Sequence, residues 1–286
     1  MTRKPHGDKC RVADSRKPLC CEAMPRPYFG THIPYAFAHR GGAFRWPENT
    51  LVAFRGAADL GIQHIETDIH LTSDGHFVCC HDATLERTTN GHGQIKDHTL
   101  AELKSLDAGY RFTDEGSFPF RGAGIQIPTL EEALELDESL RYNLEVKPPD
   151  PALARRVWEL IERYGIHDRV LVASAHDEVT EAFRVLSRGR VPTSPGRNGA
   201  LRFWAHVLTR TWRDAVFPFD ALQIPPHYKG LNVITPPFIE AARHHGIQVH
   251  VWTINDPEDM ARLARAGVNA IMTDLPVVLL EVLAEA

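Results

Sequence analysis

The stretch YAFAHRGGAFRWPENTLVAFRGAADLGIQHIETDI, residues 35–69, contains two short apolar runs separated by a helical pattern. The runs at 35–39 and 64–69 have the apolar or β-branched character of buried strands. Between them, the apolar residues of 49–60 recur at the three- and four-residue spacing of an amphipathic helix. Because strands joined by a helical crossover lie parallel in a sheet, this stretch predicts a βαβ unit.

The same unit recurs along the rest of the chain. Further strands are predicted at 142–147, 169–174, 190–192, 221–224, 248–253 and 269–273, and further helices at 129–138, 151–164, 177–187, 199–215, 236–245, 256–266 and 275–285. With the first unit, eight strands alternate with eight helices, which indicates an α/β fold with a parallel sheet. A length of 286 residues fits closure of that sheet into a (β/α)8 TIM barrel.

One apolar run, residues 76–82, interrupts this alternation. The LTSDG segment before it is too short for a parallel crossover, so the run must form an antiparallel hairpin with the preceding strand. The Asp-Gly pair at 74–75 predicts a two-residue turn, and the resulting register places Asp68 opposite His81. Glu66 shares a strand face with Asp68, so we expect Glu66, Asp68 and His81 to converge.

Two segments lie outside the barrel pattern. Residues 1–34 are rich in Arg, Lys and Pro and show no helix or strand period, which predicts a flexible N-terminal extension, with Met24 as an alternative translation start. Residues 83–125 form a long insertion after the second strand and its hairpin, with one short helical pattern at 99–107. The barrel domain is therefore predicted over residues 35–286.

Composition narrows the class of protein. The formal net charge of −5 argues against a nucleic-acid partner, because such binding depends on an excess of basic residues. No apolar run is long enough to cross a bilayer, and the N-terminus lacks the apolar centre of a secretory signal, so we expect a cytoplasmic protein. The five cysteines include no C-x-x-C pair, which argues against a zinc ribbon or a thioredoxin-like motif.

Three carboxylates lie near the ends of predicted strands. Glu66 and Asp68 share one strand, and Glu145 lies on another, with Lys147 two residues further along the same face. The carboxyl ends of barrel strands meet at one end of the barrel, so these side chains should lie together. Three carboxylates without a cluster of neutral nitrogen ligands suit a hard ion, and we expect one divalent cation, Mg²⁺ or Ca²⁺.

Two histidines, His39 and His81, each end an apolar strand. A lone histidine there is usually a structural hydrogen-bonding residue, whereas two beside a carboxylate cluster favour acid–base chemistry near neutral pH. Zinc ligation is the remaining alternative. Arg40 and Lys147 would add fixed positive charge for a phosphate. The combination indicates a site that cleaves a phosphate ester.

Seven segments carry a resemblance to a known family: HRGGAFRWPENT (39–50), IETDIHLTSDGHFVCCHDATLERTTNGHGQI (65–95), LAELKSLDAG (100–109), IPTLEEAL (127–134), NLEVK (143–147), VHVWTIN (249–255) and GVNAIMTDLP (267–276). Together they resemble the glycerophosphodiester phosphodiesterases. The resemblance covers about residues 36–278, and its first two segments are the most specific.

This resemblance implies a barrel fold with an insertion after the second strand, and metal-dependent cleavage of glycerophosphodiesters. It implies an acid–base pair, His39 and His81; three metal ligands, Glu66, Asp68 and Glu145; and two phosphate-binding residues, Arg40 and Lys147. Trp252 would form a wall beside the substrate, unless it is an aromatic plug in the barrel core.

Three details qualify the resemblance. Asn49 is interpreted as a helix N-cap and not as a substrate contact. After Ser174 the family usually has an aromatic residue, whereas here Ala175 and His176 follow, which leaves the pocket shape and the preferred alcohol open. The stretch 197–219 carries an apolar stripe, which would either lie on a membrane surface or be buried as an outer helix of the barrel; we favour burial.

The leading hypothesis is a hydrolase that acts on a small glycerophosphodiester and releases glycerol 3-phosphate and an alcohol such as choline or ethanolamine. A second hypothesis keeps the same site but acts on lysophospholipids or sphingolipid headgroups, with peripheral contact to a membrane. A third is a non-catalytic barrel that binds a metal or an anion, which is disfavoured because every residue that the chemistry needs is present. The oligomeric state stays open.

Overall fold

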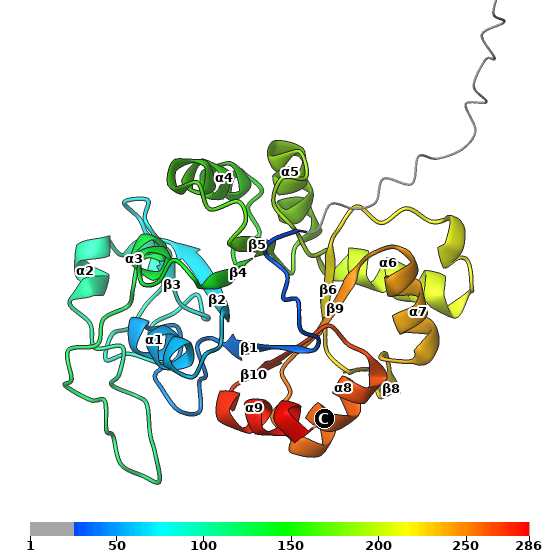
Figure 1. Ribbon diagram of the computed structural model, residues 1–286. Coiled ribbons are helices and arrows are strands. Elements are labelled where there is room, and N and C mark those ends of the chain that lie inside the picture. Colours follow the sequence, from blue (N-terminus) through cyan, green and yellow to red (C-terminus); the bar gives the residue numbers. More distant parts are fainter. Residues whose placement is uncertain (1–25, 286) are drawn as a thin grey trace, which may run out of the picture.

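The computed structural model describes residues 26–285, and its centre is a parallel sheet curled into a barrel (Figure 1). The barrel strands are β1 (Tyr35–His39), β2 (His64–Leu71), β4 (Arg141–Val146), β5 (Val170–Ala173), β6 (Ala221–Ile224), β9 (Gln248–Val251) and β10 (Ala270–Thr273). They pair in the order β5-β4-β2-β1-β10-β9-β6, and every neighbouring pair is parallel. The predicted α/β barrel is confirmed.

Helices surround the sheet on its outer face (Figure 1). They are α1 (Leu51–Asp59), α3 (Leu130–Glu135), α4 (Ala152–Tyr164), α5 (Asp177–Ser187), α6 (Arg197–Leu208), α7 (Pro236–His244), α8 (Pro257–Ala266) and α9 (Pro276–Glu285). Helix α4 illustrates why: its buried residues Leu153, Val157, Leu160 and Ile161 recur at three- and four-residue intervals and join the core against the strands. The outer surface of the sheet is thereby removed from water.

The eighth strand position is filled without a regular strand. The strand predicted at 190–192 was wrong: this part of the chain contains only an isolated β-bridge, between Thr193 and Val172. Even so, Val172 N–H donates to Pro192 O at 3.0 Å on one side, and Asp220 N–H donates to Thr193 O at 2.9 Å on the other. Pro192 has no N–H to give to a ladder, which limits pairing here. The segment nevertheless closes the barrel between β5 and β6.

The predicted register of the β2–β3 hairpin was wrong by one residue. Strand β3 is Phe77–Cys79, and Ile69 pairs with Cys79, so the position opposite Asp68 falls to Cys80 and not to His81. The reason is a three-residue loop, 73–75, whose last residue, Gly75, has a φ of +88°. A loop of three residues with glycine in the left-handed conformation is a common alternative to the two-residue turn. His81 follows the end of β3 and reaches the same region from a loop.

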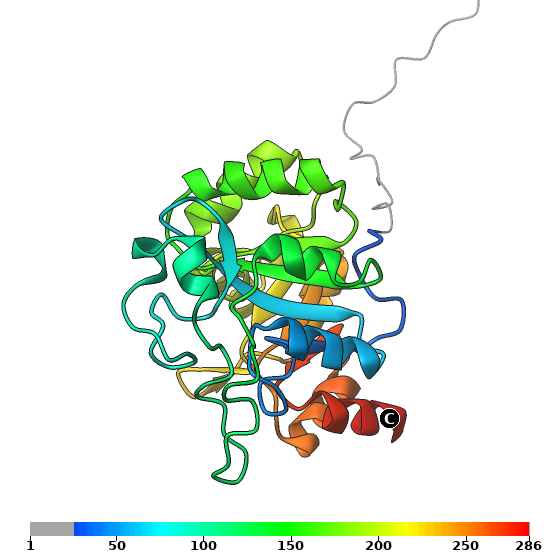
Figure 2. The ribbon, with the colours of Figure 1, turned by 90° about the vertical axis from the view of Figure 1, so that its left-hand side faces the viewer.

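The insertion at 83–125 contains a 3₁₀ turn, η1 (Ile95–Asp97), and a short helix, α2 (Leu100–Lys104), where a helical pattern was predicted. Thr99 and Glu102 form a capping box at the start of α2. The insertion has its own apolar cluster with β3, formed by Val78, Cys80, Leu85, Ile95, Leu103, Ala108, Ile125 and Ile127. In Figure 2 it lies on the left, away from the N-terminal segment. It is a packed layer and not a structureless loop.

The outer helix predicted at 199–215 is divided into α6 and a 3₁₀ turn, η2 (Trp212–Asp214). Arg210, between the two, has a φ of +57°, which an α-helix does not accommodate. Trp212 is buried and Leu208 is 65% exposed, so the predicted apolar stripe is not continuous. Beyond them, a small hairpin is formed by β7 (His227–Tyr228) and β8 (Leu231–Asn232). No helix between residues 26 and 285 is both long and apolar enough to cross a membrane.

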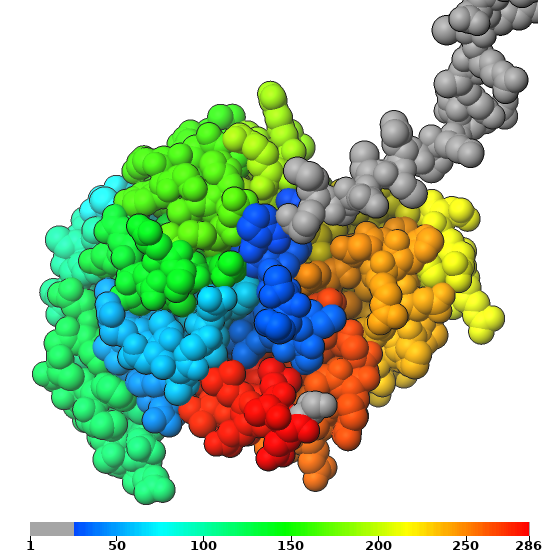
Figure 3. Space-filling model, viewed as in Figure 1, coloured from blue at the N-terminus to red at the C-terminus, as the bar shows by residue number. Residues whose placement is uncertain are grey.

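Residues 26–34 were predicted as part of a flexible extension, and this boundary was wrong. Tyr28 is completely buried, its carbonyl accepts a hydrogen bond from His64 at 2.9 Å, and Arg26 pairs with Asp220 at 2.6 Å. These partners lie at the starts of β2 and β6, so the segment covers the end of the barrel remote from the strand carboxyl ends. In Figure 3 the blue N-terminal residues lie over the centre of this face. Met24 and the rest of the predicted extension lie outside the described residues.

We predict that Tyr28→Ala destabilises the protein by about 3 kcal/mol, because it leaves a cavity under the barrel floor. Urea unfolding followed by circular dichroism measures this change. Tyr28→Phe is the matched control: the buried hydroxyl has no hydrogen-bond partner among the described residues, so its removal should leave the free energy of unfolding unchanged or slightly raised. Equal stability of Tyr28→Ala and the wild type would show that the segment does not contribute to the core.

Candidate active site

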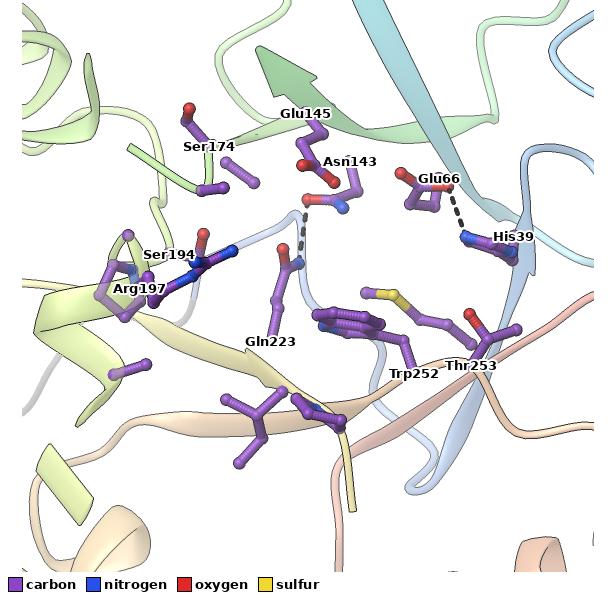
Figure 4. Close-up of a pocket in the computed structure, with 18 of the residues that line it drawn as sticks. His39, Glu66, Asn143, Glu145, Ser174, Ser194, Arg197, Gln223, Trp252 and Thr253 are labelled. Carbon is purple, nitrogen blue, oxygen red and sulfur yellow. Dashed lines mark hydrogen bonds and ion pairs between the residues drawn. The ribbon is translucent and has the colours of Figure 1, made fainter. Parts of the chain in front are cut away.

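A cavity of about 570 Å³ lies at the carboxyl ends of the barrel strands. All the side chains predicted to form the site line it: His39, Arg40, Glu66, Asp68, His81, Glu145, Lys147 and Trp252. Register explains much of this grouping, because His39 is the neighbour of Glu66 in β1 and β2, and Asp68 is the neighbour of Glu145 in β2 and β4. Figure 4 shows His39, Glu66 and Glu145 facing the cavity from three adjacent strands.

The turn after β1 brings the main chain of Arg40 to the carboxylates. Arg40, Gly41 and Gly42 all have positive φ, at +52°, +86° and +101°. A Cβ on Gly41 would lie 2.6 Å from the Cβ of Ala53 in α1, so only glycine allows the turn to pack there. The result is that the Arg40 N–H donates to Glu66 Oε2 at 3.1 Å.

Three carboxylates form the centre of the site. Their closest oxygens, from Glu66, Asp68 and Glu145, all lie within 4.8 Å of one another, and Glu66 and Asp68 are only 3% and 1% exposed. Burial, and then the Asp68 charge, raises the pKa of Glu66 to about 8. Burial also acts to raise the pKa of Asp68, but Lys147 and Arg40 outweigh it and hold that pKa below its usual value. A buried group of three oxygen donors with this excess of negative charge suits a hard divalent cation.

Two permanent cations lie against the carboxylates. Lys147 Nζ is 3.3 Å from Asp68 Oδ1 and 3.2 Å from Glu145 Oε1. Arg40 Nε is 3.5 Å from Asp68 Oδ2, and its Nη1 pairs with Glu48 at 3.1 Å. Burial acts to lower the pKa of Lys147, but the neighbouring Asp68 and Glu145 outweigh it, so the ammonium stays charged. Both cations are therefore placed to meet an anion that enters the cavity.

Asn49 is a site residue that the sequence interpretation missed. The N-cap of α1 is Thr50, whose hydroxyl accepts from Ala53 N–H at 3.2 Å, so the predicted capping role of Asn49 was wrong. Asn49 has a φ of +55° and is buried; its Nδ2 donates to Asp68 Oδ2 at 3.0 Å, and its Oδ1 accepts from Thr67 at 2.7 Å. A side chain fixed by these contacts orients the Asp68 carboxylate.

His39 is held by an aspartate on the far side of the ring from the carboxylates. Its Nδ1 lies 2.7 Å from Asp274 Oδ1, and Asn255 donates to the other oxygen of Asp274 at 2.9 Å. The Nε2 of His39 points toward Glu66, with 3.8 Å between Nε2 and Oε2 (Figure 4). Burial acts to lower the pKa of His39, but the Asp274 hydrogen bond and the Glu66 charge outweigh it, so the pKa is raised. The ring therefore leaves Nε2 on the side of the carboxylates, within the residues that line the cavity.

His81 has an equivalent support. Its Nδ1 lies 2.7 Å from Asp82 Oδ1, and Arg87 donates to the other oxygen of Asp82 at 2.5 Å and to both oxygens of Glu48. Burial acts to raise the pKa of Asp82, but the hydrogen bonds from Arg87 and His81 lower it to about 2. The supporting aspartates were missed from the sequence, although both stand where a strand ends: Asp82 beside His81, and Asp274 in the MTDLP segment.

The opposite half of the cavity is less polar. Its apolar lining includes Ala175, Ala200, Leu201, Trp204, Tyr228 and Phe238. Polar side chains here are fewer and include Ser194, Arg197 and Gln223 (Figure 4). Trp252 is 41% exposed at the cavity wall, so it is not a plug in the barrel core. The cavity thus joins a charged half to a half that can accept part of an organic molecule.

Comparison with known proteins independently supports the family resemblance seen in the sequence. Residues 39–278 match the model of the glycerophosphoryl diester phosphodiesterase family. A glycerophosphodiester phosphodiesterase from Caldanaerobacter subterraneus subsp. tengcongensis is 36% identical over 245 residues, which cover 84% of this chain and 93% of the relative. One from Bacillus subtilis is 31% identical over 252 residues, which cover 84% of this chain and 83% of the relative. The structure of an Oleispira antarctica phosphodiesterase in complex with the product sn-glycerol-3-phosphate has a TM-score of 0.71 and 26% identity, covering 88% of this chain and 97% of that chain.

We predict that Asn49→Gly weakens divalent-cation binding about tenfold to a hundredfold, because Asp68 loses its orienting hydrogen bond. Glycine accepts a φ of +55°, so this variant isolates the loss of the side chain from backbone strain. Asn49→Ala should lose affinity to the same degree and also lose about 1 kcal/mol of stability through strain at positive φ. Isothermal titration with Mg²⁺ and Ca²⁺, paired with thermal unfolding, measures both effects. Wild-type affinity in Asn49→Gly would contradict the orienting role.

Proposed function

The chain belongs to the glycerophosphoryl diester phosphodiesterase family, and we propose that it hydrolyses glycerophosphodiesters with the help of one divalent cation and two histidines. The products would be glycerol 3-phosphate and an alcohol. One observation carries the proposal: a single cavity joins three clustered carboxylates, two cations and two histidines that are each hydrogen-bonded to an aspartate. Each of these groups has a recognised role in phosphodiester cleavage: a metal ion and cationic side chains stabilise charge, and histidines transfer protons.

Glu66, Asp68 and Glu145 would hold the cation. Support comes from their spacing and from the raised pKa of Glu66, which reflects burial and the neighbouring Asp68 charge. When bound, Mg²⁺ or Ca²⁺ withdraws electron density from the phosphate oxygens and stabilises the charge that develops on them. The protein's own contribution is to fix the carboxylates: the Arg40 N–H bonds to Glu66, Asn49 to Asp68, and Lys147 to Glu145.

Arg40 and Lys147 would bind the phosphodiester. Both have hydrogen-bond donors beside the carboxylate cluster, so an anion there meets a guanidinium from the end of β1 and an ammonium from the end of β4. Their ion pairs with Glu48 and Glu145 fix both side chains before the substrate arrives. Placement of this kind lowers the reorganisation needed in the transition state.

His39 and His81 would move the protons. One must take a proton from the attacking oxygen, and the other must give a proton to the departing alkoxide. In each ring Nδ1 is hydrogen-bonded to an aspartate, so Nε2 is left for the substrate. The aspartate would also stabilise the imidazolium when it forms. The two rings reach the cavity from β1 and from the loop after β3, so they approach the phosphate from different elements.

A second substrate class is supported by the apolar half of the cavity. Leu201, Trp204, Tyr228 and Phe238 line the same space as the charged groups, and an acyl chain would fit such a wall better than glycerol does. The same site would then act on lysophospholipids and release the headgroup alcohol together with an acylated glycerol phosphate. Chemistry at the phosphorus would be unchanged.

We expect activity to require the cation. A panel of glycerophosphodiesters and lysophospholipids, assayed with and without chelator, should release glycerol 3-phosphate from the first class only when Mg²⁺ or Ca²⁺ is present. Glu145→Gln should need more cation to reach half-maximal rate, because it removes one ligand charge. Full turnover in a metal-free preparation would contradict metal dependence. Release of acylated glycerol phosphate without glycerol 3-phosphate would favour the lysophospholipid alternative.

We expect His39→Ala and His81→Ala each to lower kcat by about 10²–10⁴-fold while the cation stays bound. If the two histidines act as a pair, kcat of the double variant should fall by less than the product of the two single-variant losses. His92→Ala, an exposed histidine of the insertion that does not line the cavity, is the matched control and should keep full activity. Elemental analysis of each variant is the deciding measurement. Loss of metal in both single variants would support zinc ligation and end the acid–base assignment.

A further inference from the structure

Three permanently charged cations line the cavity: Arg40, Lys147 and Arg197. The first two are paired with carboxylates, Arg40 with Glu48 and Lys147 with Glu145. Arg197 differs, because no carboxylate oxygen between residues 26 and 285 lies within 4.0 Å of its guanidinium. A positive charge in a substrate cavity without a protein partner is available to a ligand.

The position of Arg197 is fixed by the start of α6. Its backbone N–H donates to Ala175 O at 3.0 Å. Asp177, the acidic residue next to this turn, accepts from the N–H groups of Asn198 and Gly199 at 2.8 Å each, so both of its oxygens are used to hold the helix. A Cβ on Gly196 would lie 2.4 Å from the Asp177 backbone nitrogen, which shows how closely the two segments pack. Arg197 therefore projects from a rigid base.

Its side chain extends into the cavity from the side opposite His39 and Glu66 (Figure 4). Ser194, three residues earlier, lines the same half of the cavity and is only 3% exposed, and its hydroxyl has no hydrogen-bond partner among the described residues. Ala175, whose side chain is only a methyl group, also lines the cavity. A guanidinium and a hydroxyl that lines the same half of a cavity, neither bonded to a protein acceptor among residues 26–285, are donors without acceptors.

Resting on the proposed function, we propose that Arg197 and the Ser194 hydroxyl bind a negatively charged group on the leaving alcohol of the substrate. The phosphodiester already has Arg40 and Lys147, and glycerol carries no charge, so a second anion can come only from the alcohol. A guanidinium pairs with a carboxylate or a phosphate through two parallel hydrogen bonds, and it repels an ammonium. The enzyme should therefore prefer an alcohol that carries a carboxylate over ethanolamine or choline.

Two substrates that differ by one carboxylate test this preference. Glycerophosphoserine is glycerophosphoethanolamine with a carboxylate added to the leaving alcohol, and both release glycerol 3-phosphate, so a single assay compares them. The wild-type enzyme should show a kcat/KM at least about tenfold higher for the serine ester, the scale of a charge-assisted hydrogen bond. Arg197→Gln should lower kcat/KM for the serine ester by about tenfold to a hundredfold. It should leave kcat/KM for the ethanolamine ester unchanged or raise it.

Arg202→Gln is the matched control, because Arg202 is an exposed arginine of the same helix that does not line the cavity. It should leave kcat/KM for both substrates unchanged. Ser194→Ala should lower kcat/KM for the serine ester alone, and by less than Arg197→Gln does. Equal kcat/KM values for the two esters in the wild type, or equal losses on both in Arg197→Gln, would overturn the proposal while phosphodiesterase activity stands. Absence of glycerol 3-phosphate from every substrate would instead overturn the proposed function.

Discussion

Repulsion between two buried carboxylates is the constraint that organises the active end of this barrel. Glu66 and Asp68 lie two residues apart on β2, face the same way and are almost completely buried. Two adjacent negative charges out of contact with water are unfavourable unless hydrogen bonds and opposite charges compensate them. Arg40 contacts both groups, and Lys147 and Asn49 contact Asp68, so each contributes to that compensation. Burial, and then the Asp68 charge, still raise the pKa of Glu66 above its usual value.

The parallel barrel makes such an arrangement accessible. In a parallel sheet, neighbouring strands end at the same edge, so residues distant in sequence meet there. His39 beside Glu66 and Asp68 beside Glu145 are register neighbours across three strands. Loops then add what strands cannot: the glycine turn after β1 bends the backbone N–H of Arg40 onto Glu66, and the insertion supplies Arg87 to support Asp82. Strands hold His39, Glu66, Asp68 and Glu145, and loops add His81 and the groups that orient the others.

Sequence reasoning predicted those features that depend on period and strand ends, and it failed where local geometry decides. The strands and the E-x-D, E-x-K and histidine positions follow from alternation, and all of these side chains do line one cavity. Hairpin register was missed because two- and three-residue loops containing Gly75 have nearly the same sequence signal. Asn49 was missed because an asparagine before a threonine suits a helix cap equally well, and only its positive φ turns it toward Asp68. Residues 192–194 close the barrel through a few backbone hydrogen bonds around Thr193, and so short a contact leaves no periodic pattern in the sequence.

The two halves of the cavity are constrained to different degrees, which bears on how specificity can change. In the charged half, the single carboxylate of Asp68 contacts three residues: Asn49, Arg40 and Lys147. A substitution at any of the three therefore leaves a buried charge with fewer partners. In the other half, α6 and the β7–β8 hairpin present apolar side chains with few hydrogen bonds among them. A change there alters the shape or charge offered to a substrate without removing a partner from the three clustered carboxylates. Selection for a new substrate can therefore act on this wall while the charged groups stay fixed, because no hydrogen bond or ion pair joins the described side chains of α6 and the β7–β8 hairpin to Glu66, Asp68 or Glu145.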